Sequence, residues 1–208
     1  MDLEKTVRNL QNNNMSVMVV QNGAEALQAV KSLLPPGATV THGGSVTLTE
    51  CGVTDLLKSG AYRYLDRSTD AENVYRETMS ADVFLTSSNA VTENGELYNV
   101  DGHCNRIAAI AFGPKKVVVL ASVNKIVPTL ADAVRRVKTV AAPKNAQRLH
   151  CKTYCAAMGQ CVSLTKEDPE MTDGCDSPQR ICRNYLVSAK QQDPDRITVI
   201  LIREKAGY

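Results

Sequence analysis

Five of the seven cysteines of this 208-residue chain lie within one short segment, residues 151–182. These thiols are the residues best suited to chemistry, because thiolates bind zinc and iron–sulfur clusters in preference to hard cations. Cys155, Cys161, Cys175 and Cys182 are the expected metal ligands, with Cys151 as a neighbour or a substitute ligand. The spacing matches neither a zinc ribbon nor a bacterial ferredoxin. The residues alone leave three outcomes open: a [4Fe–4S] cluster, a zinc ion, or cysteines without a metal.

A second set of candidates lies in polar loops that follow apolar strands, at residues 42–45, 87–95 and 122–125. Glycine next to a helix start lets the backbone approach an anion, so the first loop predicts a phosphate or carboxylate site. A tight strand-to-helix turn explains the same residues equally well. The candidate ligand-binding residues in and beside these loops are Gly43, Gly44, Ser45, Ser88, Asn89, Asn94, Gly95, Asp101, Asn124 and Lys125.

Two of the charged side chains in these loops are candidate catalytic residues. Glu93 precedes Asn94-Gly95 and could act as a nucleophile or general base on an exposed turn. The same spacing also fits the solvated residue of a hairpin turn, and that reading is favoured by the spacing alone. Lys125 follows an apolar strand, where its cation could pair with an anionic ligand.

The elements that must position these residues alternate between apolar strands and helical patterns. Such alternation predicts an α/β fold with an open, mainly parallel sheet that has helices on both faces, and ligands at the carboxyl ends of its strands. A strand expected after the cysteine-rich segment suggests that this segment folds back onto the sheet. The expected strands are 17–20, 38–41, 82–86, 96–100, 117–121 and 196–202; the expected helices are 2–14, 24–34, 46–58 and 69–79.

Composition excludes several classes of protein. The net charge of +2 and the absence of Trp argue against nucleic-acid binding. Each apolar run is too short to span a membrane. The polar N-terminal residues lack the features of a signal peptide, which predicts a cytoplasmic location. The length fits a single domain over residues 1–208 that carries the cysteine-rich segment, residues 151–182.

Several motifs, taken in order, resemble the LUD (lactate utilisation, LutC-like) domain family. The resemblance covers roughly residues 5–150. The motifs that carry it are 43–48 (GGSVTL), 88–95 (SNAVTENG), 99–102 (NVDG), 113–116 (GPKK) and 123–127 (VNKIV). The cysteines at 155, 161, 175 and 182 resemble a C-terminal motif of LUD proteins from anaerobes, which is regarded there as a cluster-binding site. An acidic insertion at 166–173 separates the two halves of that motif here.

The resemblance implies a fold like that of ribose-5-phosphate isomerase and CoA transferases, and a role in lactate or other organic-acid oxidation. It also implies a small anionic organic acid or phosphorylated compound as ligand, and iron–sulfur and flavin-type proteins as partners. A homo-oligomer is a further expectation. Two alternatives stay open: a non-catalytic metabolite-binding or regulatory subunit, and an isomerase or CoA transferase. The second alternative would use Glu93, because Glu93-Asn94-Gly95 is similar to the turn that carries the acyl-accepting glutamate of some CoA transferases.

Overall fold

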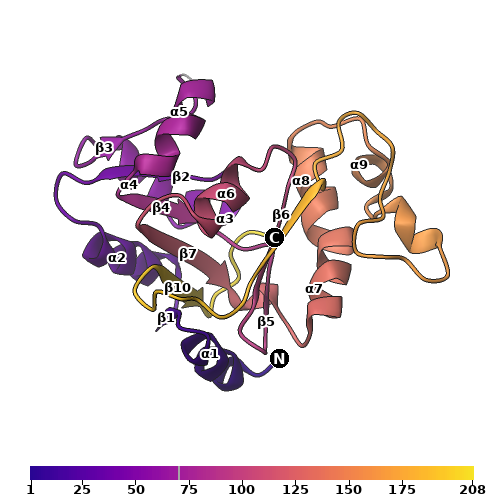
Figure 1. Ribbon diagram of the computed structural model, residues 1–208, viewed down its shortest axis with the longest axis horizontal. Helices are drawn as coiled ribbons and strands as arrows, with labels where there is room; N and C mark the ends of the chain where they lie inside the picture. The colour runs from indigo at the N-terminus through magenta and orange to yellow at the C-terminus, as the bar shows by residue number, and fades with distance from the viewer. Residues whose placement is uncertain (70) are drawn as a thin grey trace.

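The computed structural model describes residues 1–69 and 71–208, and of residues 71 and 72 it describes the backbone alone. A six-stranded, wholly parallel sheet forms the larger part of the molecule (Figure 1). Its strands, in spatial order, are β1 (Ser16–Val20), β10 (Ile197–Ile202), β7 (Lys116–Ser122), β4 (Val83–Thr86), β2 (Thr39–His42) and β3 (Arg63–Tyr64). The prediction of an α/β fold with a mainly parallel sheet is confirmed.

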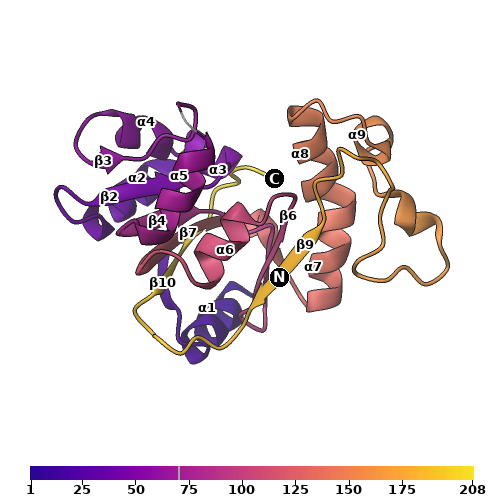
Figure 2. The same ribbon diagram turned by 45° about the horizontal axis from the view of Figure 1, so that its top comes forward.

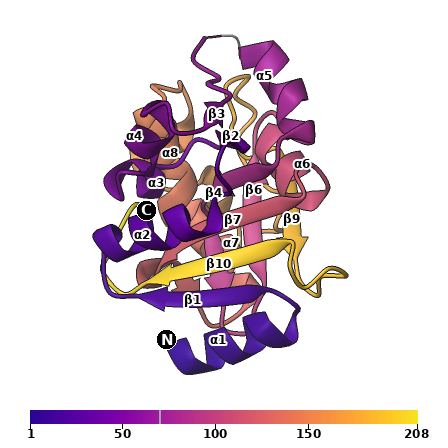
Figure 3. The same ribbon diagram turned by 90° about the vertical axis from the view of Figure 1, so that its left-hand side faces the viewer.

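Helices cover both faces of this sheet. Successive strand residues point to opposite sides, and the strands carry apolar residues on both sides that must be buried. Val118 and Leu120 of β7 pack in one buried cluster, whereas Val117 and Val119 pack in the other. The first cluster includes residues of α2 (Gly23–Leu33), α3 (Val46–Glu50) and α4 (Val53–Lys58), and the second includes residues of α1 (Leu3–Asn12) and α6 (Asn105–Ala111). Figure 3 shows β10 lying between the edge strand β1 and β7.

A second sheet of four shorter strands and a long helical stretch form the other side of the molecule (Figure 2). The strand order is β8 (Ile126–Val127), β5 (Ala90–Thr92), β6 (Leu97–Asp101) and β9 (Asn184–Ser188), with only β5 and β8 parallel. The helical stretch runs through α7 (Leu130–Arg136), a π-helical turn (Val137–Ala141) and α8 (Ala142–Arg148). Tyr98 and Val137 belong to the cluster buried between sheet and helices.

The structure differs from the sequence prediction in identifiable places. One helix is predicted over residues 46–58, but Gly52 adopts a left-handed conformation with φ 72° and separates α3 from α4. The helix predicted at 69–79 is observed as α5 (Ala71–Glu77), followed by a 3-10 turn (Thr78–Ser80). Its predicted start includes Asp70, which lies outside the described residues.

The cysteine-rich segment lies outside the large sheet, beside α8. It contains α9 (Tyr154–Met158) and a 3-10 turn (Val162–Thr165), and its remaining residues are loops. The chain then returns through β9 to β10, so the predicted end strand is present in the large sheet, but the cysteine-rich segment itself packs beside α8 and not on that sheet. Within the described part of the chain, no helix is both long and apolar enough to span a membrane.

Candidate functional site

A cavity of about 620 Å³ lies where β2, β4 and β7 end, and we call it the strand-end pocket. Gly44 and Ser45 follow β2, Ser87 to Asn89 follow β4, and Lys125 follows β7, so all three predicted loops contribute lining residues. Residues at the end of α8 and residues 178–181 and 183 also line it. This is the position in which open parallel sheets bind ligands.

Gly43 and Gly44 allow two arginine side chains to approach the loop after β2. A Cβ atom on Gly43 would lie 2.9 Å from Cδ of Arg106, and one on Gly44 would lie 2.8 Å from a guanidinium nitrogen of Arg67. Ser45 caps α3, since its hydroxyl accepts a hydrogen bond of 3.3 Å from the Leu48 N–H. The absence of a side chain at Gly43 and Gly44 therefore lets the two arginine side chains pack beside this loop, a role that does not depend on a ligand approaching the backbone.

Arg106 holds the polar residues of the pocket floor in place. Its guanidinium forms an ion pair of 2.7 Å with Asp101 and donates hydrogen bonds to the side chains of Asn89 and Asn99, at 2.9 and 2.5 Å. It also donates to the carbonyl oxygen of Ser87 at 3.2 Å. Because these partners come from the loop between β4 and β5 and from β6, Arg106 fixes how that loop sits relative to β6.

Lys125 is buried at the end of β7, with 3% of its surface exposed. Its amine donates hydrogen bonds to the hydroxyls of Thr47, at 2.8 Å, and Ser87, at 2.9 Å. Burial, together with the charges of Arg136 and Arg106, lowers the pKa of Lys125 to about 7. In the part of the chain that the structure describes, no carboxylate forms an ion pair with this amine.

Arg136, on α7, lies behind the pocket floor and is also buried. Its guanidinium donates to the carbonyl oxygens of Asn89 and, at 3.3 Å, of Asn124. Burial lowers its pKa to about 10, because the charged form loses solvation there. Arg136 thus adds a buried positive charge that has carbonyl oxygens as its hydrogen-bond acceptors.

The lining of the strand-end pocket is strongly basic. Asp101 is the sole Asp or Glu among the described lining residues, and it already pairs with Arg106. Buried or confined charges need compensation, so this excess favours an anionic ligand. The lysine and arginine side chains that line the pocket are Arg67, Arg106, Lys125, Arg148, Arg180 and Arg183.

Most of the predicted ligand-binding residues meet at this pocket, but three lie elsewhere. Gly44, Ser45, Ser88, Asn89, Asp101 and Lys125 line it, and Gly43 packs against its Arg106. Asn124 lies behind the lining: its amide group donates to the carbonyl oxygen of Gly207 at 3.2 Å. Its side-chain oxygen is buried without a hydrogen-bond partner among the described residues.

Glu93, Asn94 and Gly95 form the turn between β5 and β6, at the side of α1, and none of them lines the pocket. The Glu93 carboxylate accepts a hydrogen bond of 2.8 Å from the Asp2 N–H and one of 3.3 Å from Lys5. These bonds lower the pKa of Glu93. The structure thus places Glu93 in a hairpin turn that α1 holds, away from the other candidate residues.

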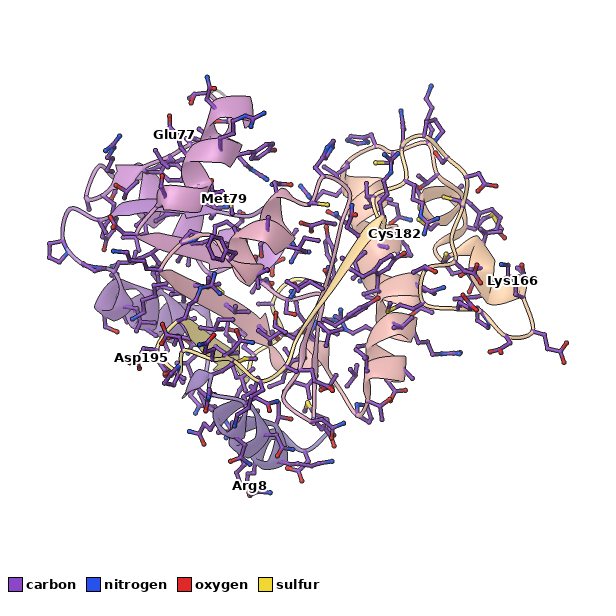
Figure 4. The ribbon with its side chains drawn as sticks, viewed as in Figure 1. Arg8, Glu77, Met79, Lys166, Cys182 and Asp195 are labelled. Carbon is purple, nitrogen blue, oxygen red and sulfur yellow. The ribbon has the colours of Figure 1, made fainter. Side chains whose placement is uncertain are left out.

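The four predicted metal ligands line one small cavity, which we call the cysteine cavity. Cys155, Cys161, Cys175 and Cys182 all contribute to its wall, whereas Cys151 lines the strand-end pocket. Burial raises the pKa of Cys155 and of Cys182, so these thiols need a metal or a cation to ionise readily. In Figure 4, Cys182 lies at the start of β9, next to α8.

The thiols are not gathered tightly enough for a single ion. Among the described residues, no three Cys, His, Asp or Glu side chains are placed so that they could hold one metal ion. A zinc ion needs ligands at about 2.3 Å from a common point. An iron–sulfur cube carries its cysteines on separate irons, so it accepts thiols that lie farther apart. Four cysteine thiols are a donor set that both zinc and a [4Fe–4S] cluster accept.

The cavity also carries its own cations. Lys138 donates to the Ser163 hydroxyl at 2.8 Å and to the carbonyl oxygens of Glu170 and Asp173 at 2.6 and 3.1 Å. Arg180 donates to the carbonyl oxygen of Cys182 at 2.9 Å. These bonds hold the loops of the cysteine-rich segment together and place positive charge beside the thiols.

Sequence reasoning missed the arginines of the strand-end pocket. Arg67 and Arg106 come from loops and a helix start, and Arg148 lies in the last turn of α8. None of them belongs to a motif of small polar residues at a strand end. A search for arginines near strand ends would also have selected many solvated arginines, so no local pattern in the sequence could have identified these three.

Comparison with known proteins gives one family and several structural likenesses. The model of the LUD domain matches residues 3–202, a range that includes the cysteine-rich segment. A DUF162 family protein from Deinococcus radiodurans is 16% identical, with a TM-score of 0.57 over 96% of this chain and 95% of that one. At this identity the likeness shows a shared fold.

A weaker likeness is to ribose 5-phosphate isomerase A from Neisseria gonorrhoeae, at 16% identity and a TM-score of 0.36. It covers 52% of this chain and 54% of that one. This score is too low to carry an argument about the site. No curated protein gives a significant sequence match.

Proposed function

This chain belongs to the LUD domain family, and we propose that its strand-end pocket binds a small anionic organic acid of lactate-type metabolism. The observation that carries the proposal is the charge of the side chains that line the pocket, among which the only described Asp or Glu, Asp101, already pairs with Arg106. A carboxylate or phosphate ligand would compensate the remaining cations. The metabolic role is supported by the family resemblance alone.

Arg67 is the arginine best placed to bind this ligand. Its guanidinium packs against Gly44, and within the described residues it makes no side-chain hydrogen bond or ion pair. Arg106, in contrast, already donates to five protein oxygens. Arg67 therefore has its donors available for a carboxylate, and Arg106 positions the residues of the pocket floor.

Calorimetric titration with L-lactate, pyruvate, citrate and phosphate tests this proposal. We expect saturable binding of at least one of these anions, and a loss of at least about tenfold in affinity, or about 1.4 kcal/mol, in Arg67→Gln. Arg8→Gln is the matched control, since Arg8 lies on α1 at the other end of the molecule (Figure 4). Binding of none of the four anions, or equal affinity in both variants, would contradict the proposal.

We further propose that the cysteine cavity binds a [4Fe–4S] cluster through Cys155, Cys161, Cys175 and Cys182. Such a cluster supplies one-electron transfer when it is bound. The proposal is supported by the four thiols in one cavity and by the cations of Lys138 and Arg180 beside them. The chain between Cys175 and the start of β9 contributes to both sites, since Cys175 and Cys182 line the cysteine cavity and residues 178–181 and 183 line the strand-end pocket.

Metal analysis of anaerobically purified protein tests the cluster. We expect about four irons and four sulfides per chain, with a broad visible absorbance that dithionite bleaches. Cys182→Ser should lower both contents, whereas Cys51→Ser, in the core beside α3, should leave them unchanged. One zinc per chain, or no metal after reconstitution with iron and sulfide, would overturn the assignment.

Organic-acid oxidation and metabolite sensing remain two roles for the same sites. Lactate turnover with an artificial electron acceptor supports oxidation by this chain together with its partner proteins. Tight binding without turnover, when acceptor and partners are supplied, supports a regulatory subunit. A CoA transferase that uses Glu93 has no support from the geometry, because Glu93 lies outside the pocket.

A further inference from the structure

The amine of Lys125 is placed as a nucleophile. It lines the strand-end pocket although the residue is almost wholly buried, and its two hydrogen-bond acceptors are the hydroxyls of Thr47 and Ser87. A neutral amine has two N–H bonds and one lone pair, which matches two acceptors and one open position. An ammonium group in the same place would keep these two acceptors and direct its third N–H into the pocket.

Lys138 is a buried lysine with a structural role, and it provides a comparison for Lys125. Its amine is also buried, but it has three acceptors: the Ser163 hydroxyl and the carbonyl oxygens of Glu170 and Asp173. Three acceptors satisfy an ammonium group completely. The two buried lysines therefore differ in the number of their acceptors, and this difference separates a cation that fastens loops from an amine with an open position.

The charges around Lys125 favour the neutral amine. Arg106 on α6 and Arg136 on α7 are the cations that face it, while Glu50 and Cys51, at the end of α3, act in the opposite direction. The Glu50 carboxylate is engaged, since it accepts a hydrogen bond of 2.6 Å from the Gly207 N–H. Burial and the two arginines dominate and lower the pKa of Lys125 to about 7, so about half of the amine is neutral at neutral pH.

We propose that Lys125 forms an imine with the carbonyl carbon of a small oxo acid or anionic aldehyde bound in the strand-end pocket. This inference rests on the proposed anion binding, because the guanidinium groups would hold the acid group while the carbonyl meets the amine. Desolvation and neighbouring cations are the means by which proteins activate a lysine for this chemistry. The site would then accept carbonyl compounds selectively among small anions.

The step balances without an oxidant or a reductant. The neutral amine adds to the carbonyl carbon: a C–N bond forms, the C=O π bond breaks, and one proton moves from the nitrogen to the oxygen to give a neutral carbinolamine. Loss of that oxygen as water, with one further proton from solvent, leaves a protonated imine. The hydroxyls of Ser87 and Thr47, which already contact the amine, are placed to pass protons during both stages. The iminium then acidifies the neighbouring C–H bonds of the bound acid.

Reductive trapping tests the proposal directly. The full chain is incubated with glyoxylate, a two-carbon aldehyde acid, and sodium cyanoborohydride at limiting labelling, and each lysine is followed by peptide mass spectrometry. An amine with the ordinary lysine pKa of about 10.4 is almost wholly protonated at pH 7. We therefore expect Lys125 to be labelled at least about tenfold faster than Lys144, an exposed lysine on α8. Lys138, buried with three acceptors, is the internal control for burial and should stay unlabelled.

The pH profile adds a second readout. The labelling rate at Lys125 should rise through about pH 7 and then level off. The proposal is overturned if Lys125 is labelled no faster than Lys144, or if its rate begins to rise only above pH 9.

The labelling experiment and the calorimetric titration together separate this inference from the proposed function. If an anion binds in the calorimeter but Lys125 is not labelled fast, the imine proposal is rejected and the anion-binding proposal stands. Fast labelling at Lys125 without binding of any of the four test anions would remove the proposed anion site and keep a reactive lysine.

Discussion

At the scale of single residues, arginine side chains decide the chemistry of the strand-end pocket. The predicted residues at the strand ends are mostly small and polar, and they depend on Arg106 for their positions. Gly43 and Gly44 matter because a Cβ atom on either would meet an arginine side chain. Apart from Lys125, the positive charge of the pocket therefore arises from arginines that no short motif includes.

The buried amine of Lys125 predicts a pH dependence of stability. The pKa of Lys125 is about 7 in the folded chain and about 10.5 in the unfolded one. Between these values the unfolded state binds more protons, so the free energy of unfolding rises with pH, by up to about 1.4 kcal/mol per pH unit. Below pH 7 the lysine is charged in both states and the contribution is flat.

Urea unfolding of wild type and Lys125→Met from pH 6 to 10 measures this effect. The difference in free energy of unfolding should shift in favour of wild type as the pH rises above 7. Lys144→Met, on the exposed side of α8, controls for the loss of one positive charge. Parallel pH profiles for wild type and Lys125→Met would show that the folded-state pKa is not lowered.

At the scale of elements, two glycines with positive φ determine where a helix is interrupted and where a hairpin turns. Gly52 separates α3 from α4 through its left-handed conformation, although the apolar pattern continues across it. Gly95, with φ 81°, closes the turn between β5 and β6 against α1. A Cβ atom there would lie 2.4 Å from a backbone carbon of Asn9. Both positions need a backbone conformation that residues with a Cβ rarely adopt.

Gly95→Ala is expected to destabilise the protein much more than Gly60→Ala. Both glycines have positive φ, but no atom lies within 4 Å of a Cβ on Gly60. Gly60→Ala should cost about 1 kcal/mol for its conformation. Gly95→Ala should cost about 1–3 kcal/mol more, since the turn must move away from α1. Urea unfolding compares the two variants, and an equal loss in both would mean that α1 does not pack closely on this turn.

At the scale of the whole molecule, the parallel sheet and the cysteine-rich segment are built on different principles. The sheet buries apolar side chains on both faces, and β10, between β1 and β7, is wholly buried. The cysteine-rich segment has short helical turns and loops, and side-chain hydrogen bonds of Lys138 and Arg180 connect them. A small cavity of about 20 Å³ among its thiols has room for about one water molecule.

Binding of a cluster should therefore change the cysteine-rich segment and leave the sheet unchanged. A [4Fe–4S] cube is larger than the cysteine cavity, so the loops must move outward to accept it and then become constrained by four bonds. Hydrogen exchange before and after reconstitution with iron and sulfide should show increased protection in residues 151–182. Amides of β7 and β10 should exchange as before, and equal changes in those strands would contradict this division.

The sequence by itself determined the parallel sheet, since β1, β2, β4, β7 and β10 correspond to predicted strands and alternate with helices. It also selected four cysteines that meet in one cavity and three loops that meet at one pocket. It did not reveal the second sheet: β5 and β8 are too short for a periodic signal, and β9 follows directly on the loops of the cysteine-rich segment. Alternation and helical spacing are local patterns, so they predict only elements long enough to repeat them.

Only the tertiary structure decided which residues share a site. Glu93 and Lys125 are both polar residues after apolar strands, yet β5 carries Glu93 to α1 while Lys125 stays at the pocket. Arg67 and Arg106 reach the same pocket from distant positions in the chain. The physical reason is that a local pattern depends on neighbouring residues alone. Proximity depends on how the strands are ordered and on how far long side chains extend across the sheet.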